Sequence, residues 1–107
     1  MKGYQLSFLT VQGHRHAGRT VADWLLHLAM EMGLRGATAI AGSEGFGKHR
    51  RIHASHFFEL SDQPIEVLIA VTEEESDALL ERIRKENVHV FYVKAPVEFG
   101  VIGEPGA

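Results

Sequence analysis

The chain contains no cysteine among its 107 residues. Disulfides, thiolate metal sites and cysteine nucleophiles are therefore excluded. No apolar run approaches the roughly 18 residues that a membrane-spanning helix requires. The first residues are too polar for a signal peptide, so we expect a cytoplasmic location. The formal net charge is only −3, which argues against a basic domain that binds nucleic acid.

The composition is that of an ordinary globular chain, with 45% hydrophobic and 23% charged residues. A second core is not plausible at this length, so we expect a single domain over residues 1–107. Hydrophobic periodicity predicts the order strand, helix, strand, long loop, strand, helix, strand. The predicted strands are 4–11, 37–41, 64–71 and 88–93, the predicted helices are about 19–32 and about 73–85, and 95–107 is expected to be a short edge strand or a tail.

The third strand and the second helix have the clearest local signals. Large apolar residues at every second position of 65–71 predict a strand with one face in the core. Thr72, followed three residues later by Glu75, is a capping box that marks the start of the second helix. Gly33 stands where a glycine ends the first helix.

The predicted order matches the ferredoxin-like split βαβ arrangement, an α+β sandwich with two helices on one face of the sheet. The other face of such a sheet must be hidden from water. Residues 65–71 carry large apolar side chains on both faces. We therefore expect the open face to be buried against copies of the same chain.

A connection of about twenty residues, 42–62, joins the second and third predicted strands. It is glycine-rich at its start and then strongly cationic, with Gly42, Gly45, Gly47, Lys48, His49, Arg50, Arg51 and His53. Glycines let backbone amides approach a ligand closely, and successive amides can form an anion-binding concavity. The adjacent cations fit a phosphate or a carboxylate. An ordinary exposed loop with a solvated basic face would have the same composition.

The same region resembles the PII superfamily of signalling proteins. The similarity lies in the run Gly33-Leu34-Arg35-Gly36-Ala37-Thr38, the triplet Gly45-Phe46-Gly47 and the basic residues that lead to His53. The whole chain is most similar to PII-like proteins of about this length with GLxGAT and GxxGFG motifs, and the likeness extends from about Gly18 to Arg84.

This resemblance implies a ferredoxin-like homotrimer with ligand clefts between its subunits. It also implies a regulatory role toward a membrane transporter or an enzyme, a nucleotide-type effector, and a T-loop over 42–62. The triplet would line the cleft with its backbone, the strand residue Thr38 would lie near the base, and nearby cations would meet the charge of the ligand. The implied ligand-binding residues are Thr38, Gly45, Phe46, Gly47, Lys48, His49, Arg50 and Arg51.

The chain departs from the typical PII pattern in three places. Thr38 and Gly45 are one residue further apart, the glycine-rich B-loop after the second helix is replaced by the glycine-free segment 84–89, and 95–107 has no cation. A triphosphate would thus lack most of its phosphate partners. We expect an effector less charged than ATP with magnesium, namely ADP, AMP, a cyclic nucleotide or a small anion, or no nucleotide, and no certain cofactor.

Seven histidines also permit a metal-binding interpretation. His14 and His16 stand two apart, and His49, His53 and His56 lie in the long connection. A metal site needs three or four convergent donors, and no HExxH-type spacing occurs, so we assign no metal ligand. A metal-binding trimer related to proteins of divalent-cation tolerance remains the alternative. No serine has a recognisable nucleophile elbow, so we do not expect an enzyme.

Overall fold

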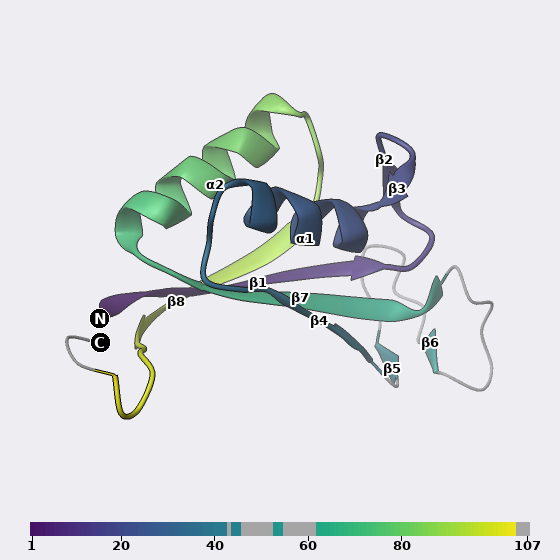
Figure 1. The fold of residues 1–107 in the computed structure, drawn as a ribbon. Helices are drawn as coiled ribbons and strands as arrows, with labels where there is room; N and C mark the ends of the chain where they lie inside the picture. The colour runs from purple at the N-terminus through teal and green to yellow at the C-terminus, as the bar shows by residue number, and fades with distance from the viewer. Residues whose placement is uncertain (43, 46–52, 55–61, 105–107) are drawn as a thin grey trace.

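The computed structural model of the chain describes residues 1–42, 44–45, 53–54 and 62–104. Two helices cover one face of a four-stranded antiparallel sheet, and no helix among these residues lies on the opposite face (Figure 1). The elements in chain order are β1 (Lys2–Val11), β2 (Arg15–His16), β3 (Arg19–Thr20), α1 (Val21–Glu31), β4 (Thr38–Ala41), β5 (Glu44–Gly45), β6 (His53–Ala54), β7 (Pro64–Val71), α2 (Glu73–Lys85) and β8 (Phe91–Glu98).

The strand order of the main sheet is β4-β7-β1-β8. The central pair, β1 and β7, is in register from Tyr4 opposite Val71 to Val11 opposite Pro64. Within the described residues, β4 pairs with β7 alone and β8 with β1 alone, so both are edge strands of this sheet. This order is the predicted ferredoxin-like arrangement, and the predicted fold class is confirmed.

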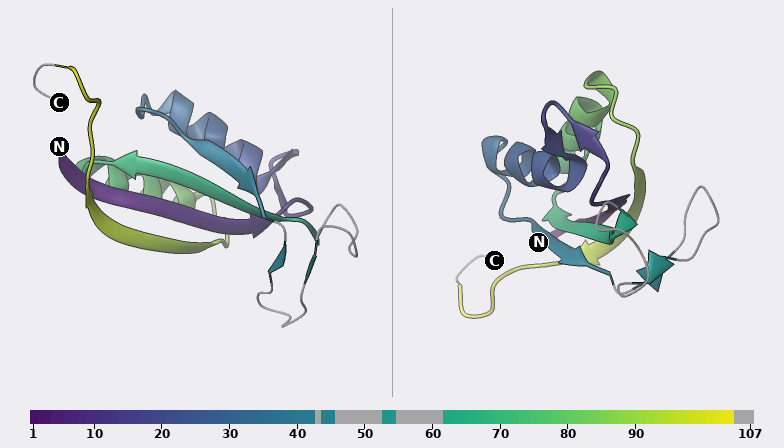
Figure 2. Two further views of the ribbon diagram at one scale, coloured as in Figure 1. Left: turned by 90° about the horizontal axis from the view of Figure 1, so that it is seen from below. Right: turned by 90° about the vertical axis from the view of Figure 1, so that its right-hand side faces the viewer.

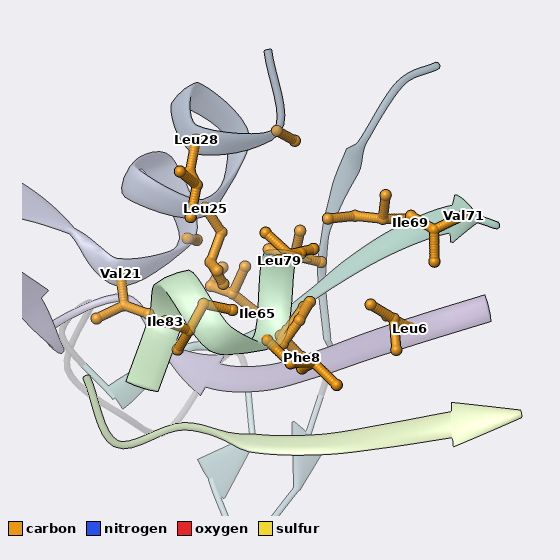
Figure 3. Close-up of a cluster of buried hydrophobic side chains, with 14 residues drawn as sticks. Leu6, Phe8, Val21, Leu25, Leu28, Ile65, Ile69, Val71, Leu79 and Ile83 are labelled. Atoms are coloured by element: carbon orange, nitrogen blue, oxygen red, sulfur yellow. The ribbon is translucent and has the colours of Figure 1, made fainter. Parts of the chain in front are cut away.

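The core lies between the helices and the sheet (Figure 3). α1 contributes Leu25 and Leu28, and the sheet contributes Phe8 from β1. The apolar residues that alternate along β7 are all buried, as their spacing predicts. The buried apolar side chains are Leu6, Phe8, Val21, Ala22, Leu25, Leu28, Ala29, Ile65, Val67, Ile69, Val71, Leu79, Leu80 and Ile83.

Both helices begin at a threonine cap. The Thr20 hydroxyl accepts a hydrogen bond from the backbone N–H of Asp23 at the start of α1. At the start of α2, Thr72 and Glu75 form the predicted capping box, in which each side chain accepts a hydrogen bond from the other residue's backbone N–H. Gly33 follows α1 with a φ of 72°, a conformation that favours glycine.

The predicted strand over 88–93 is misplaced. The strand is β8, which begins three residues later and continues through the first four residues of 95–107, the segment expected to be a short edge strand or a tail. In the sequence, Pro96 suggests the end of a strand, because proline has no backbone N–H to donate to a neighbouring strand. β8 is an edge strand, where one side of the backbone has no neighbour in the sheet and proline is tolerated.

A small hairpin lies between β1 and α1. Arg15 and His16 of β2 pair with Thr20 and Arg19 of β3. Its two loop residues, Ala17 and Gly18, both have positive φ, as a two-residue type I′ turn requires. The His16 imidazole joins this hairpin to both helices: Nε2 lies 3.3 Å from Oε1 of Glu86, and the ring centroid lies 4.9 Å from that of Trp24.

Candidate functional site

The predicted ligand-binding residues begin on β4. Thr38 is the first residue of β4 and lies opposite Leu68 of β7. Gly45 is the last residue of β5 and pairs with His53 of β6. Phe46, Gly47, Lys48, His49, Arg50 and Arg51 lie outside the described residues. The structure therefore places Thr38 and Gly45 on consecutive strands that lead into the predicted T-loop.

The two ends of this long connection are held together at one end of the sheet. The backbone N–H of Gly42 donates to the carbonyl of Pro64 over 2.8 Å, and that of Gln12 donates to the carbonyl of Gln63 over 2.9 Å. A side chain at Gly42 would begin 3.3 Å from Cβ of Pro64, so the close approach suits glycine. β5 and β6 lie beyond this point, on the side away from the helices (Figure 1).

The open face of the sheet is largely apolar, although Glu66 of β7, opposite both Leu9 and Ile40, also lies on it. Residues directly opposite each other in antiparallel strands point to the same face of the sheet. Leu9 and Ser7 of β1 point to the open face, so their cross-strand neighbours lie on that face too. Figure 2 shows this face without a covering helix. Phe91 on it is 66% exposed. The large apolar residues of this surface, which we name the open-face patch, are Leu9, Ile40, Leu68, Phe91 and Val93. Such a patch marks an interaction surface.

β4 does not pack under a helix, although its small side chains suit such a position. All four of its residues, Thr38 to Ala41, are exposed. The strand carries no charge and no proline that would protect an open edge. Over the described residues, β4 is therefore an open edge of the sheet.

At the opposite end of the sheet, Arg35 connects three segments. Its guanidinium Nη1 donates to Oε1 of Glu75 over 2.9 Å, and its Cζ lies 5.2 Å from the ring centroid of Phe99. The hydrogen bond from the Thr72 backbone, together with the nearby Arg35 charge, lowers the pKa of Glu75 below its ordinary value of 4.5. The loop before β4, the start of α2 and the residue after β8 are thereby joined.

A concavity lies between α2 and β8, on the side of the sheet that carries the helices. Its volume is about 600 Å³. α2 packs chiefly on β1 and β7, so the side of β8 that faces the helices is left uncovered. The polar and aromatic side chains that line this hollow, which we name the α2–β8 hollow, are Asp77, Glu81, Arg84, Tyr92 and Lys94.

Sequence reasoning misses the α2–β8 hollow. It places Arg84 at the end of the second predicted helix and Lys94 just beyond the misplaced strand over 88–93. A strand that begins at Phe91 would have predicted this surface, because side chains alternate between the two faces of a strand. Tyr92 and Lys94 then share one face, while Phe91 and Val93 share the other.

The described residues contain no group of three or more histidine, aspartate or glutamate side chains that could hold a metal ion. His14 lies against Thr10, with Nδ1 3.2 Å from Oγ1, and His16 lies against Glu86. Two histidines of the metal-binding alternative, His49 and His56, lie outside the described residues. Neither described helix is long and apolar enough to cross a membrane.

Solved structures of PII-like proteins share this architecture. CPII from Thiomonas intermedia K12, a nitrogen regulatory PII-like protein bound to ADP, AMP and bicarbonate, matches with a TM-score of 0.68 and 21% identity, over 94% of this chain and 91% of that chain. A proposed PII-like signalling protein from Thermus thermophilus matches with a TM-score of 0.67 and 16% identity, over 91% and 88% of the two chains. The fold is thus that of the PII-like proteins.

Sequence comparison gives the family. The model of the DUF190 family, described as "Uncharacterized ACR, COG1993", matches residues 3–99. A UPF0166 protein of Aquifex aeolicus (strain VF5) is 34% identical over 80 residues, which make up 74% of this chain and 76% of the relative. The chain belongs to the DUF190 family, and its fold agrees with the predicted resemblance to PII-like proteins.

Proposed function

We propose that this protein is a cytoplasmic PII-like regulator that binds an adenine nucleotide of the ADP or AMP type, or a small anion, in clefts between the subunits of a homotrimer. The connection over 42–62 acts as its T-loop. Ligand binding selects one conformation of this loop, and a partner such as a membrane transporter or an enzyme responds to that conformation.

The position of the long connection carries this proposal. It leaves the sheet from an exposed edge strand, β4, and its ends are held together by the Gly42–Pro64 hydrogen bond. A ligand beside Gly45 would therefore contact the base of the T-loop, where a small displacement changes the direction of the whole segment. CPII, which has the same fold, is bound to ADP, AMP and bicarbonate, and this supports the choice of ligand class.

The open-face patch supports the homotrimer. Its large apolar side chains span all four strands, and exposure of this surface to water is unfavourable. Association of three copies around an axis would bury it and bring the edge of each sheet close to its neighbour.

Isothermal titration calorimetry tests the ligand assignment. The panel contains ATP, ADP, AMP, cyclic AMP and bicarbonate, each with and without magnesium, together with zinc and copper. We expect ADP or AMP to bind the wild-type protein, and Gly45→Val to abolish that binding while the assembly stays intact. Gly36→Val is the matched control, because Gly36 has open space around it and no positive φ.

Two results would contradict this function. Absence of heat with every nucleotide and with bicarbonate, combined with tight binding of zinc or copper, would favour the metal-binding trimer. Unchanged nucleotide affinity in Gly45→Val would mean that the ligand binds elsewhere on the protein.

A further inference from the structure

Glu66 is a lone charge on the open face of the sheet. It lies on the central strand β7, opposite Leu9 of β1 on one side and Ile40 of β4 on the other. Leu68 stands two residues further along β7 on the same face. Every other residue that the strand pairing places on this face of the described sheet is uncharged. The carboxylate therefore lies between members of the open-face patch.

The charge of Glu66 is stabilised by water in the single chain. The ion pairs formed among the described residues do not include Glu66. Its side chain is partly buried within the sheet surface, while the flanking Leu9 and Ile40 are 43% and 49% exposed. An ionised Glu66 is thus compatible with this face only as long as the face stays in contact with water.

Burial of the open-face patch would remove that water. A second copy of the chain would bring the same face, on which the described residues include no cation. Hydroxyl groups such as those of Ser7 and Thr38 can donate hydrogen bonds to a carboxylate, but they do not neutralise its charge. Removing an unpaired carboxylate from water is strongly unfavourable, and a carboxyl group in such surroundings takes up a proton instead.

The chemistry of this surface suits a second copy better than a cationic partner. A cationic partner requires several carboxylates, and the described face offers one among apolar side chains. The adjoining edge strand, β4, is exposed and uncharged, and its Ile40 belongs to the patch. An uncharged strand edge beside an apolar face is complementary to another copy of the same surface.

We propose that self-association of the chain through its open face is coupled to protonation of Glu66. This inference rests on the homotrimer of the proposed function. Because association favours the neutral carboxyl group, the assembly is strongest in acid and weakens as the pH rises. Each proton taken up lowers the association constant by about 10-fold for each pH unit above the range in which an exposed glutamate titrates, so three subunits give up to about 1,000-fold. The assembly would then respond to pH as well as to its effector.

Glu66→Gln tests this coupling, because glutamine has the shape of a protonated glutamate and carries no charge. Glu74→Gln is the matched control, since Glu74 is an exposed carboxylate on α2, on the other side of the sheet. Sedimentation velocity over a dilution series gives the association constants of both variants and of the wild type. The series is run at about pH 5, 6.5 and 8, at constant ionic strength and with EDTA, so that no divalent metal ion can neutralise the carboxylate.

The difference between Glu66→Gln and the wild type should depend on pH. At pH 8 we expect Glu66→Gln to associate about 10-fold more tightly or better, and at pH 5 the two proteins should agree within about 2-fold. Glu74→Gln should follow the wild type throughout. If the assembly does not dissociate on dilution, Tm at fixed protein concentration measures the same difference, because association stabilises the folded chain.

Three results would overturn the inference. A wild-type protein that stays monomeric at every pH would refute the homotrimer and this inference together. An assembled wild type that differs from Glu66→Gln equally at pH 5 and at pH 8 would refute this inference alone. Loss of assembly in Glu66→Gln at pH 8, with the fold intact by circular dichroism, would show that the charge itself is needed and that Glu66 meets a cation of its partner.

Discussion

Gly3 is the position where a single methyl group should do the most damage to the sheet. It lies near the start of β1, opposite Val97 of β8 and next to the Tyr4–Val71 pair. A Cβ atom added to Gly3 would lie 2.0 Å from the carbonyl oxygen of Val71 and 2.9 Å from Cε1 of Phe99. The first of these atoms belongs to the backbone of β7 and cannot rotate away.

The size of the effect follows from these distances. A relaxed C···O contact is about 3.3 Å, so Gly3→Ala requires β1 and β7 to separate by roughly 1.3 Å at this end. Such a shift is too large for the neighbouring hydrogen bonds to remain intact. We expect the free energy of unfolding to fall by about 1–3 kcal/mol, the usual cost of overpacking. For a domain of about 100 residues, a loss of 2 kcal/mol lowers Tm by roughly 8–16 °C.

Urea and thermal unfolding, followed by circular dichroism, measure this effect. Protein concentration is kept constant, because the Tm of an oligomer depends on it. Gly36→Ala is the matched control: Gly36 has open space around it, and the substitution should be neutral or stabilising by up to about 1 kcal/mol. Surface substitutions usually change the free energy of unfolding by no more than about 0.5 kcal/mol. If the free energies of unfolding of Gly3→Ala and Gly36→Ala differ by less than this, the packing described for Gly3 is wrong.

Three further predictions concern α2, the core and the open face. The pKa of Glu75 is lowered in the folded protein, so its contribution to stability is complete above the ordinary value of 4.5 and is lost as the pH falls through the folded value. Glu75→Gln should remove that pH dependence and Glu74→Gln should keep it, as urea unfolding between about pH 3 and 7 would show. Leu25→Ala should lower the free energy of unfolding by about 2–5 kcal/mol, because Leu25 is fully buried. Met30→Ala should change it by less than about 0.5 kcal/mol, because Met30 is 71% exposed. Equal losses in the two variants would contradict the described core. Phe91→Glu should convert the proposed trimer into monomers in light scattering, and an unchanged mass would exclude the open-face patch as the subunit interface.

The parts of the fold with strong local signals could be predicted from the sequence. β7 has the predicted bounds because 65–71 alternates strictly and is followed at once by the Thr72 capping box. α1 is within two residues of its predicted range because Thr20 caps it and Gly33 follows it. In each case the physical cause lies within a few residues of the element.

The bounds of β8 were harder to predict, because they depend on the position of the strand in the sheet and not on the neighbouring residues alone. Pro96 is unfavourable within a central strand and harmless at an edge, and only the complete sheet shows that β8 is an edge. The α2–β8 hollow was missed for the same reason, since Arg84 and Lys94 meet only when α2 is packed over β1 and β7. The Arg35–Glu75 ion pair likewise joins residues 40 positions apart. The structure gives the positions of Thr38 and Gly45 in the fold. Their role in ligand binding stays a prediction.

The hydrogen bond between Gly42 and Pro64 has a consequence for how this family can diversify. It closes the long connection at its base, so the sheet is complete whatever the intervening residues are. The entropic cost of closing a loop rises by only about 0.6 kcal/mol for each doubling of its length. Selection can therefore lengthen, shorten or exchange the segment between these two residues with little effect on the stability of the domain. Under the proposed function, exchange of that one segment would change the partner while the sheet and its core stay the same.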